Sequence, residues 1–420
     1  MERYRRPVGI DLFAGAGGMS LGFERAGFDV AAAVEVDPVH CATHAFNFPA
    51  CKTICRSVAN ISGSEIRDLA SIGNQEVGVV FGGAPCQGFS LIGKRALDDP
   101  RNSLVYHFVR LVGEIQPSYF VFENVRGLTV GEHKNFLEEL ISAFARIEYD
   151  VVTPYAVLNA RSYGVPQNRQ RLFLMGARRD MPQPIYPHSL DSVVTVQEAI
   201  GDLPEADEFL ELRTRDWTRA EFSVPSSYAR KLRGIANDAD DYGYKRAYDP
   251  CVLTSSLRTA HTEKSRRRFA ATQFGKTEPV SRFFKLDPNG VCNTLRAGTG
   301  SDRGAFTSPR PIHPYTPRCI TNREAARLHS YPDWFRFHVT KWHGFRQIGN
   351  SVPPLLAQAV ARQVILALGV KPKRPKCVVE LGDPGLLEFS MADAARYYGV
   401  PDDTIPKRVR SSNTNEAVYA

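Results

Sequence analysis

The residues of this chain that are best suited to chemistry gather around Cys86. An apolar run at residues 77–81 stops at Gly82 and Gly83, and a Pro-Cys pair follows directly. The stretch that then leads to the next helical pattern, at Ser103, is several times longer than the usual strand-to-helix connection of about 2–6 residues. A cysteine at the start of such a stretch belongs either to an active-site loop that moves or to a buried structural position.

Other polar residues follow predicted strands further along the chain. Glu123 ends the apolar run at residues 119–122, and a carboxylate at the carboxyl end of a strand lies where open α/β sheets bind ligands. Gln167, Arg169 and Arg171 are two residues apart, so on an extended backbone they share one face. These three side chains could hold a polar or anionic group, and a solvated edge strand is the alternative.

A glycine-rich turn near the N-terminus predicts a nucleotide site. An apolar run at residues 8–13 leads into this turn at residues 14–18, and a helical pattern follows that Gly27 closes. The next predicted strand places Glu35 20 positions after Gly15, where a carboxylate can take ribose hydroxyls. The glycine spacing differs from the dinucleotide motif, so this pattern alone does not separate NAD, FAD and S-adenosylmethionine.

The alternation of helical and strand patterns predicts a doubly wound α/β sheet with helices on both faces. The remaining helices are expected at residues 38–46, 103–115, 133–147, 321–329 and 355–368, and the remaining strands at 30–36 and 151–157. The functional residues named above follow strands, which brings them to one edge of this sheet.

Five possible metal ligands lie close together in the sequence. They are His40, Cys41, His44, Cys51 and Cys55. Their spacings match no usual zinc framework, and the first three fall on one expected helix. We therefore expect no metal site.

Charge is unevenly distributed along the 420 residues, a length that suggests two or three domains. Residues 251–350 hold 17 Lys and Arg against 6 Asp and Glu, a balance of 17 − 6 = +11, so the net charge of +8 leaves 8 − 11 = −3 elsewhere. Between residues 182 and 318 the helix–strand alternation lapses, and basic residues interleave with aromatic ones. This region is expected to form a loop-rich domain that contacts nucleic acid, with a solvated surface as the alternative.

The sequence also indicates where the protein works. No apolar run approaches the ~20 residues of a membrane span. The first residues lead directly into a strand, so we expect no signal peptide. The eight cysteines are scattered, as expected of free thiols in a reducing cytoplasm.

Taken in order, these motifs resemble the DNA cytosine-5 methyltransferase family over nearly all of residues 8–369. The matching motifs are DLFAGAGG at 11–18, Pro85-Cys86-Gln87, Glu123-Asn124-Val125, Gln167-x-Arg169-x-Arg171, Arg323-Glu324 and QIGNSVPP at 347–354. Two departures stand out. Ser57 occupies the position where the family often has an aspartate for the adenine amino group, and Ala84 precedes Pro85 where the family commonly has a second proline.

The resemblance implies a mechanism for each of these groups. Cys86 would add to C6 of a cytosine that is flipped out of the duplex, while protonated Glu123 donates to N3. Arg169 and Arg171 would hold the cytosine and its phosphate. Residues 88–102 would close over the base. S-adenosylmethionine would be the methyl donor, and no metal is required.

The resemblance also implies the binding residues. Those expected against the cofactor are Phe13, Gly15, Ala16, Gly17, Gly18, Glu35, Ser57, Pro85, Asn350, Ser351 and Val352. Those expected against DNA are Gln87, Ser90, Lys94, Arg95, Arg101, Arg266, Arg267, Arg268 and Arg282.

We therefore predict a Rossmann-like catalytic domain at residues 1–185, completed by residues 340–370. Residues 186–339 are predicted to form a smaller target-recognition domain, and residues 371–420 a linker and tail to which the sequence assigns no role. The whole resembles a bacterial, cytoplasmic, monomeric modification enzyme for double-stranded DNA, paired with a restriction endonuclease. The alternatives are a tRNA cytosine-5 methyltransferase, which the long variable domain disfavours, an inactive DNA-binding relative, and, least favoured, a dehydrogenase.

Overall fold

One mixed sheet forms the centre of the molecule. The computed structural model describes residues 6–85, 103–129, 133–236, 238–298 and 310–405. The strands of the sheet are β1 (Val8–Leu12), β2 (Asp29–Glu35), β3 (Lys52–Cys55), β4 (Val77–Gly83), β5 (Tyr119–Val125), β6 (Tyr149–Val151), β7 (Ala156–Asn159) and β8 (Gln170–Arg178). Their order is β3-β2-β1-β4-β5-β8-β6, with β7 also paired to β8. The first five strands are parallel, and β8 runs antiparallel to β5.

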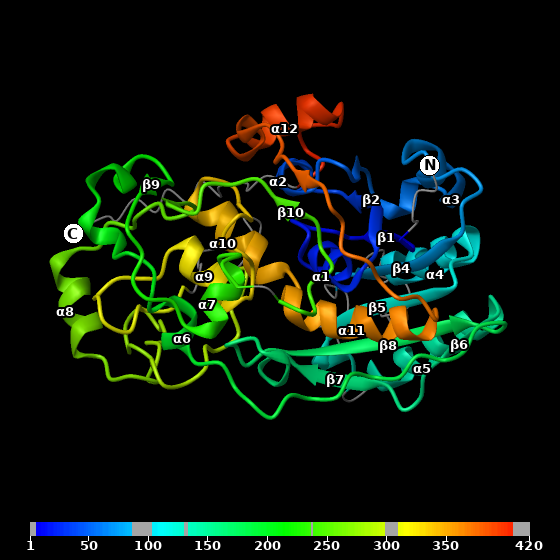
Figure 1. Cartoon of the computed structure of the whole chain (residues 1–420), viewed down its shortest axis with the longest axis horizontal. Coiled ribbons are helices and arrows are strands. Elements are labelled where there is room, and N and C mark those ends of the chain that lie inside the picture. The colour runs from blue at the N-terminus through cyan, green and yellow to red at the C-terminus, as the bar shows by residue number, and fades with distance from the viewer. Residues whose placement is uncertain (1–5, 86–102, 130–132, 237, 299–309, 406–420) are drawn as a thin grey trace, which may run out of the picture.

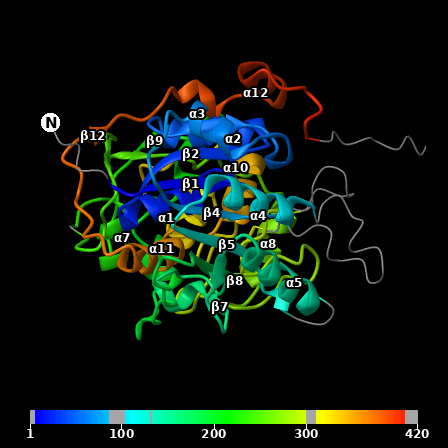
Figure 2. The ribbon, with the colours of Figure 1, turned by 90° about the vertical axis from the view of Figure 1, so that its right-hand side faces the viewer.

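Helices cover both faces of this sheet, which confirms the predicted fold class (Figure 2). One face carries α3 (Gly63–Leu69), α4 (Ser103–Ile115) and α5 (His133–Arg146), and the other carries α1 (Gly18–Ala26) and α11 (Pro354–Ala367). The strands between them are almost continuously apolar because both of their faces are buried. Within the described ranges, no helix combines the length and the apolar character needed to span a membrane.

The predicted single strand at residues 151–157 is wrong. The chain forms β6 and β7 there, and each pairs separately with β8. Pro154 lies between the two strands and has no backbone N–H to donate, so the ladder is interrupted at that position.

The last helix of the catalytic fold returns to lie on the first (Figure 1). A Cβ atom placed on Gly22 of α1 would come within 2.4 Å of the Ala357 Cβ and 2.7 Å of the Pro354 carbonyl oxygen of α11. At this point the two helices pack closely, with the Ala357 methyl group and the α11 backbone directly against Gly22. The N-terminal and C-terminal parts of the chain therefore build one structure.

The remaining elements form a loop-rich region beside the sheet (Figure 1). They are α6 (Val196–Ile200), β9 (Thr218–Arg219), α7 (Ser227–Leu232), β10 (Lys245–Arg246), β11 (Val252–Leu253), α8 (Glu263–Ala271), α9 (Asn322–Leu328) and α10 (Lys341–Asn350). Their apolar core also includes Leu21 of α1 and Phe48, so it is continuous with the sheet domain.

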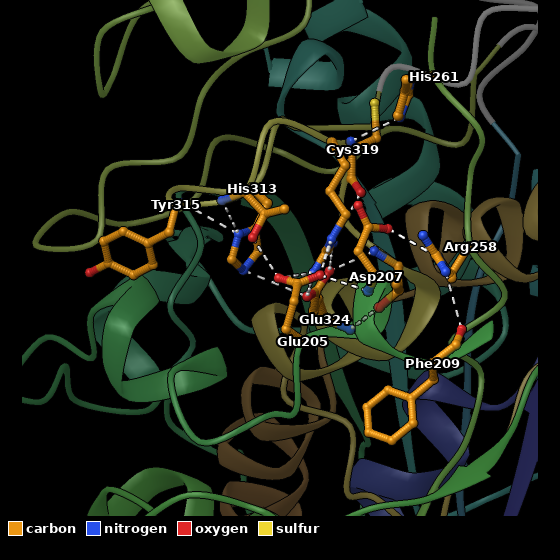
Figure 3. Close-up of polar contacts among 12 residues, drawn as sticks. Glu205, Asp207, Phe209, Arg258, His261, His313, Tyr315, Cys319 and Glu324 are labelled. Carbon is orange, nitrogen blue, oxygen red and sulfur yellow. Dashed lines mark hydrogen bonds and ion pairs between the residues drawn. The ribbon is translucent and has the colours of Figure 1, made fainter. Parts of the chain in front are cut away.

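Buried ion pairs hold the loops of this region together (Figure 3). The Arg318 side chain is only 3% exposed and lies 2.7 Å from both Glu205 and Glu324. His313 lies 3.6 Å from the same Glu324 carboxylate. Arg318 thereby connects α9 to the loop that follows α6, in a region with few backbone ladders to fix its shape.

The C-terminal tail packs against both parts of the molecule. Its strand β12 (Val378–Val379) pairs with β10, and its helix α12 (Met391–Tyr398) lies on α2 (Pro38–Asn47). Leu386 and Leu387 join Phe46 of α2 in a small apolar cluster. The tail thus links the loop-rich region to the first half of the sheet.

The contact between α1 and α11 predicts that Gly22→Ala lowers the free energy of unfolding by about 1–3 kcal/mol, because the added methyl overpacks the contact. The matched control is Gly113→Ala in α4, where the new Cβ would meet only Ile147 side-chain atoms, at 3.5 Å or more. That change removes a helix-interior glycine and should leave stability equal or higher by up to about 1 kcal/mol. Urea unfolding measures both, and equal effects would contradict the prediction.

Candidate active site

The strands that precede the glycine-rich turn, Pro85 and Glu123 end next to one another at one edge of the sheet. Leu12 pairs with Gly82, and Gly83 pairs with Glu123, so β1, β4 and β5 end side by side. The strand order also reverses between β1 and β4. In open α/β sheets this reversal opens a crevice at the carboxyl ends of the strands, which is the usual ligand site.

The glycine-rich turn lies at this reversal point and contacts the next strand. The backbone N–H of Gly15 donates to Glu35 Oε2 at 2.8 Å, and Glu35 Oε1 accepts from the N–H groups of Val36 and Asp37. Gly15 has φ +55°, and a Cβ atom there would meet nothing within 4 Å. The space above Gly15 is therefore open to a ligand. Phe13 begins the turn in a left-handed conformation, with φ 63°.

The C-terminal return closes the other side of the turn. A Cβ atom on Gly18 would lie 2.5 Å from the Val352 carbonyl oxygen, 2.7 Å from the Tyr331 hydroxyl and 2.9 Å from the Ser351 Cβ. Asn350 is exposed at the end of α10. These contacts place the two halves of the predicted cofactor site next to each other.

Tyr331 was not predicted from the sequence. Its side chain is fully buried, and its hydroxyl has no hydrogen-bond partner among the residues that the structure describes. A buried hydroxyl without a partner is costly unless a ligand satisfies it. No local sequence signal marks Tyr331, because its position beside Gly18 depends on the packing of α9 and α10.

The other predicted cofactor residues border the same turn. Gly17 caps α1 in the left-handed conformation, and Ala16 is buried beneath it. Ser57 follows β3, where the N–H of Arg56 donates to the Glu35 carbonyl, and its hydroxyl accepts from Ala59 N–H. These residues, the open space above Gly15 and the unpaired Tyr331 hydroxyl fit a nucleoside-containing cofactor. No group of three or more His, Cys, Asp or Glu within the described residues could hold a metal ion.

The predicted nucleophile, Cys86, lies outside the described residues, as do Gln87, Ser90, Lys94, Arg95 and Arg101. The strand that leads to it is described as far as Pro85, which is exposed. The Asn124 side-chain amide donates to the Ala84 carbonyl at 3.2 Å and so holds the end of β4 against β5.

Glu123 lies directly against this end of β4. A Cβ atom on Gly83 would come within 2.5 Å of Glu123 Oε2, so only glycine leaves room for the carboxylate. Glu123 is 8% exposed, and its Oε1 lies 2.8 Å from Arg171 Nε. Burial raises the pKa of Glu123, although Arg171 and Arg169 oppose this shift. A raised pKa suits a carboxyl group that must donate a proton.

The two arginines of the Gln-x-Arg-x-Arg motif have different surroundings. Arg169 is 1% exposed, and its guanidinium donates to the backbone carbonyls of Leu295, Gly349 and Ser351 at 2.8–2.9 Å. Gln167 is also buried and bonds to Leu328 and His329. The solvated edge strand that the sequence allowed is therefore excluded. Arg171 is the arginine that reaches the Glu123 carboxylate.

The predicted DNA-binding arginines of the loop-rich region each lie near a carboxylate, except Arg282. Arg266 pairs with Asp207 at 2.9 Å, Arg267 with Glu263 at 3.2 Å and Arg268 with Glu278 at 3.4 Å. Arg282 is exposed. The first three arginines would have to exchange these partners to contact phosphate.

Comparison with known proteins decides the family. The sequence model of the C-5 cytosine-specific DNA methylases matches residues 8–366. The chain belongs to this family. It is 63% identical to the Type II methyltransferase M.XorII of Xanthomonas oryzae over 405 residues, which cover 96% of this chain and 95% of that protein. It is 34% identical to the Type II methyltransferase M.DdeI of Desulfomicrobium norvegicum over 388 residues, covering 84% and 88%.

Solved structures agree with this assignment. A protein provisionally described as a DNA modification methyltransferase encoded within a prophage (E. coli) superposes with a TM-score of 0.73 at 34% identity, covering 87% of this chain and all of that one. The Dnmt2 methyltransferase of S. pombe superposes with a TM-score of 0.54 at 14% identity, over 87% of this chain and 100% of its own, which shows a shared fold alone. This protein is thus a methyltransferase of the cytosine-5 family.

The different surroundings of the two arginines predict different effects of their removal. Arg169→Met removes the hydrogen bonds to three buried carbonyls, of which that of Ser351 keeps His329 Nε2 as a partner, and should lower the free energy of unfolding by about 3–5 kcal/mol. Arg171→Gln should cost less than half of that, because Glu123 can take up a proton once its partner is lost. Urea unfolding of both variants checks this, and an Arg169→Met protein as stable as the parent would contradict it.

Proposed function

We propose that the protein methylates C5 of a specific cytosine in double-stranded DNA with S-adenosylmethionine, through a covalent bond between Cys86 and C6 of the base. The observation that carries this proposal is the position of Glu123. Its buried carboxylate lies against Gly83, at the start of the segment that contains Pro85 and Cys86, and is paired with Arg171.

The chemistry explains why these groups belong together. Cytosine C5 is a poor nucleophile until a thiolate adds to C6 and converts the ring to an enamine. Cys86 would provide this thiolate. The addition pushes negative charge onto N3 and O2, so Glu123 donates its proton to N3 and Arg171 is available to O2. C5 of the enamine would then take the methyl group from the sulfonium centre, which would leave as a neutral thioether. Water or hydroxide would accept the C5 proton, and elimination of Cys86 with return of the N3 proton to Glu123 would release the product.

The cofactor would supply an electrophilic methyl group bound to its sulfonium centre. The residues around the glycine-rich turn would hold it. Glu35, which contacts the turn through the Gly15 N–H, would accept from the ribose hydroxyls, and the turn at Gly15 to Gly18 would allow close approach to the backbone. Tyr331 offers its unpaired hydroxyl to the part of the cofactor nearest Gly18.

The target carbon is inaccessible within a stacked duplex, so the base must be flipped out. Lys94, Arg95 and Arg101 would contact phosphates beside the flipped base, and Arg282, which is exposed, would do the same from the loop-rich region. The protein would act as a monomer in a bacterial cytoplasm, where its methylation protects host DNA from a cognate restriction endonuclease. Bisulfite sequencing of DNA from cells that express the gene would identify the target cytosine.

Substrate choice separates this proposal from methylation of tRNA. With labelled S-adenosylmethionine, we expect incorporation into duplex DNA and at least about 100-fold less into tRNA, because the long loop-rich region would recognise a duplex. Label found only in tRNA would overturn the proposal. Binding of NAD without binding of S-adenosylmethionine would instead support a dehydrogenase.

The nucleophile can be tested by trapping. Duplex DNA with 5-fluorocytosine at the target cannot lose a proton from C5, so the wild-type protein should form a stable covalent adduct with it in the presence of the cofactor. The Cys86→Ala variant should form none on a denaturing gel. An adduct that persists in this variant would show that another residue attacks the base.

The acid can be tested independently. Glu123→Gln keeps a hydrogen-bond donor at N3 but cannot transfer a proton, so the rate should fall by about 100–10,000-fold. Thermal stability should fall only modestly, because the amide keeps the size of the side chain and its oxygen can still accept from Arg171, although the ion pair is lost. A methylation rate within a factor of about three of the wild type would exclude Glu123 as the acid.

A further inference from the structure

A chain of four buried polar side chains runs beneath the glycine-rich turn. It begins at Asp11 on β1, passes through Ser20 on α1 and His44 on α2, and ends at Thr53 on β3. Asp11 is 1% exposed, and Ser20 and His44 are fully buried. Asp11 belongs to the cofactor motif but has no expected role of its own, and His44 was expected at most as a metal ligand.

The distances show that each link is a hydrogen bond. The Ser20 hydroxyl lies 2.6 Å from Asp11 Oδ2 and 3.1 Å from His44 Nε2. The other ring nitrogen of His44, Nδ1, lies 3.1 Å from the Thr53 hydroxyl. Both ring nitrogens are therefore engaged, and four elements of the fold are connected through side chains alone.

This chain touches the cofactor turn directly. A Cβ atom on Gly17, the residue that caps α1, would lie 3.0 Å from His44 Cδ2 and 2.4 Å from the ring of Phe48. Ser20 lies in the first turn of the same helix, whose N-terminus faces the proposed cofactor site. The His44 and Phe48 rings therefore pack against Gly17 and leave no room for a side chain there.

The proton order along the chain has two solutions. When Asp11 is ionised, Ser20 donates to Asp11, His44 Nε2–H donates to Ser20, and Thr53 donates to His44 Nδ1. When Asp11 carries a proton on Oδ2, every bond reverses, and His44 carries its proton on Nδ1 and donates to Thr53. A hydroxyl has one hydrogen and a neutral imidazole has one, so no mixed order satisfies all three bonds.

We propose that Asp11, Ser20, His44 and Thr53 form a positioning relay that holds the glycine-rich turn in its cofactor-binding geometry and reverses its hydrogen bonds when Asp11 takes up a proton. The proposal rests on the function proposed above only in that the turn binds S-adenosylmethionine. The four residues act through Gly17 and do not touch the reacting atoms.

The charges around the relay support two states near neutral pH. Burial raises the pKa of Asp11 to about 8, although the hydrogen bond from Ser20 lowers it and Glu35 on β2 raises it. Cys51 and Tyr331 also face Asp11. Burial lowers the pKa of His44 to about 3, so its ring stays neutral and has a single proton to place.

Cofactor affinity tests the positioning role. Calorimetry with S-adenosylmethionine and with S-adenosylhomocysteine should show about tenfold weaker binding to Ser20→Ala than to the wild type, with kcat at saturating cofactor nearly unchanged. The matched control is Ser118→Ala. This change also removes a buried serine hydroxyl, which donates to Glu76 at 3.0 Å. Ser118 lies just before β5, at the opposite edge of the sheet, so the affinity for both compounds should stay unchanged.

A second variant protects the test if Ser20→Ala folds poorly. Thr53→Val preserves the shape of a half-buried side chain and removes only the last link, so binding should weaken by about threefold. Unchanged affinity in a folded relay variant would overturn the positioning role. A wild-type protein that binds neither S-adenosylmethionine nor S-adenosylhomocysteine would refute the proposed function instead. The direction of the hydrogen bonds in the relay could still be measured in that protein.

The reversal has its own spectroscopic readout. The nitrogen NMR signals of His44 can be observed in a protein labelled with ¹⁵N-histidine and assigned from their absence in His44→Gln. The ring should be protonated on Nδ1 below the pKa of Asp11, about 8, and on Nε2 above it. Asp11→Asn, which cannot ionise, should abolish this change. A charged ring, or one tautomer across the whole range, would overturn the proposed reversal.

Discussion

Helix α1 packs directly on helix α11. The surroundings of the glycine-rich turn and of Arg169 both depend on this contact. Gly18 and Gly22 provide the surface, because any side chain at either position would strike the returning chain. The contact brings Ser351 and Val352 next to the glycine-rich turn that follows β1. It also delivers the carbonyls of Gly349 and Ser351 to the Arg169 guanidinium. The proposed cofactor site and the arrangement of β8 are thus consequences of one helix packing.

Buried arginines replace regular secondary structure as the organising elements of the loop-rich region. Arg169 joins β8 to this region through the Leu295 carbonyl, and Arg318 joins α9 to the loop after α6 through two carboxylates. A guanidinium has five donors in a fixed plane, so one side chain can satisfy groups from several segments. Loss of either arginine would remove hydrogen bonds from buried acceptors on several segments at once, which is costly. This explains how short elements can form a defined surface.

The elements around the site were predictable because their signals are local. Continuous apolar runs, the glycine turn and Gly27 identified β1, α1, β2, β4 and β5 close to their observed bounds. The surroundings of Arg169 and the position of Tyr331 could not be predicted, since their partners are more than 100 residues away or on another helix. The division into β6 and β7 was missed because the apolar pattern outweighed Pro154. The roles proposed for Cys86 and Glu123 came from the order of the motifs, and the structure adds the surroundings of Glu123.

The tail also bears on how the protein can be handled. The family match ends at residue 366, yet β12 and α12 cover β10 and α2 beyond that point. A shortened protein designed from the family boundary would leave the apolar surface around Ala42 and Phe46 exposed to water. Such surfaces favour aggregation during expression. Purification tags and fusion partners therefore belong after residue 405, and a chimaera that exchanges the loop-rich region should take its tail from the same parent.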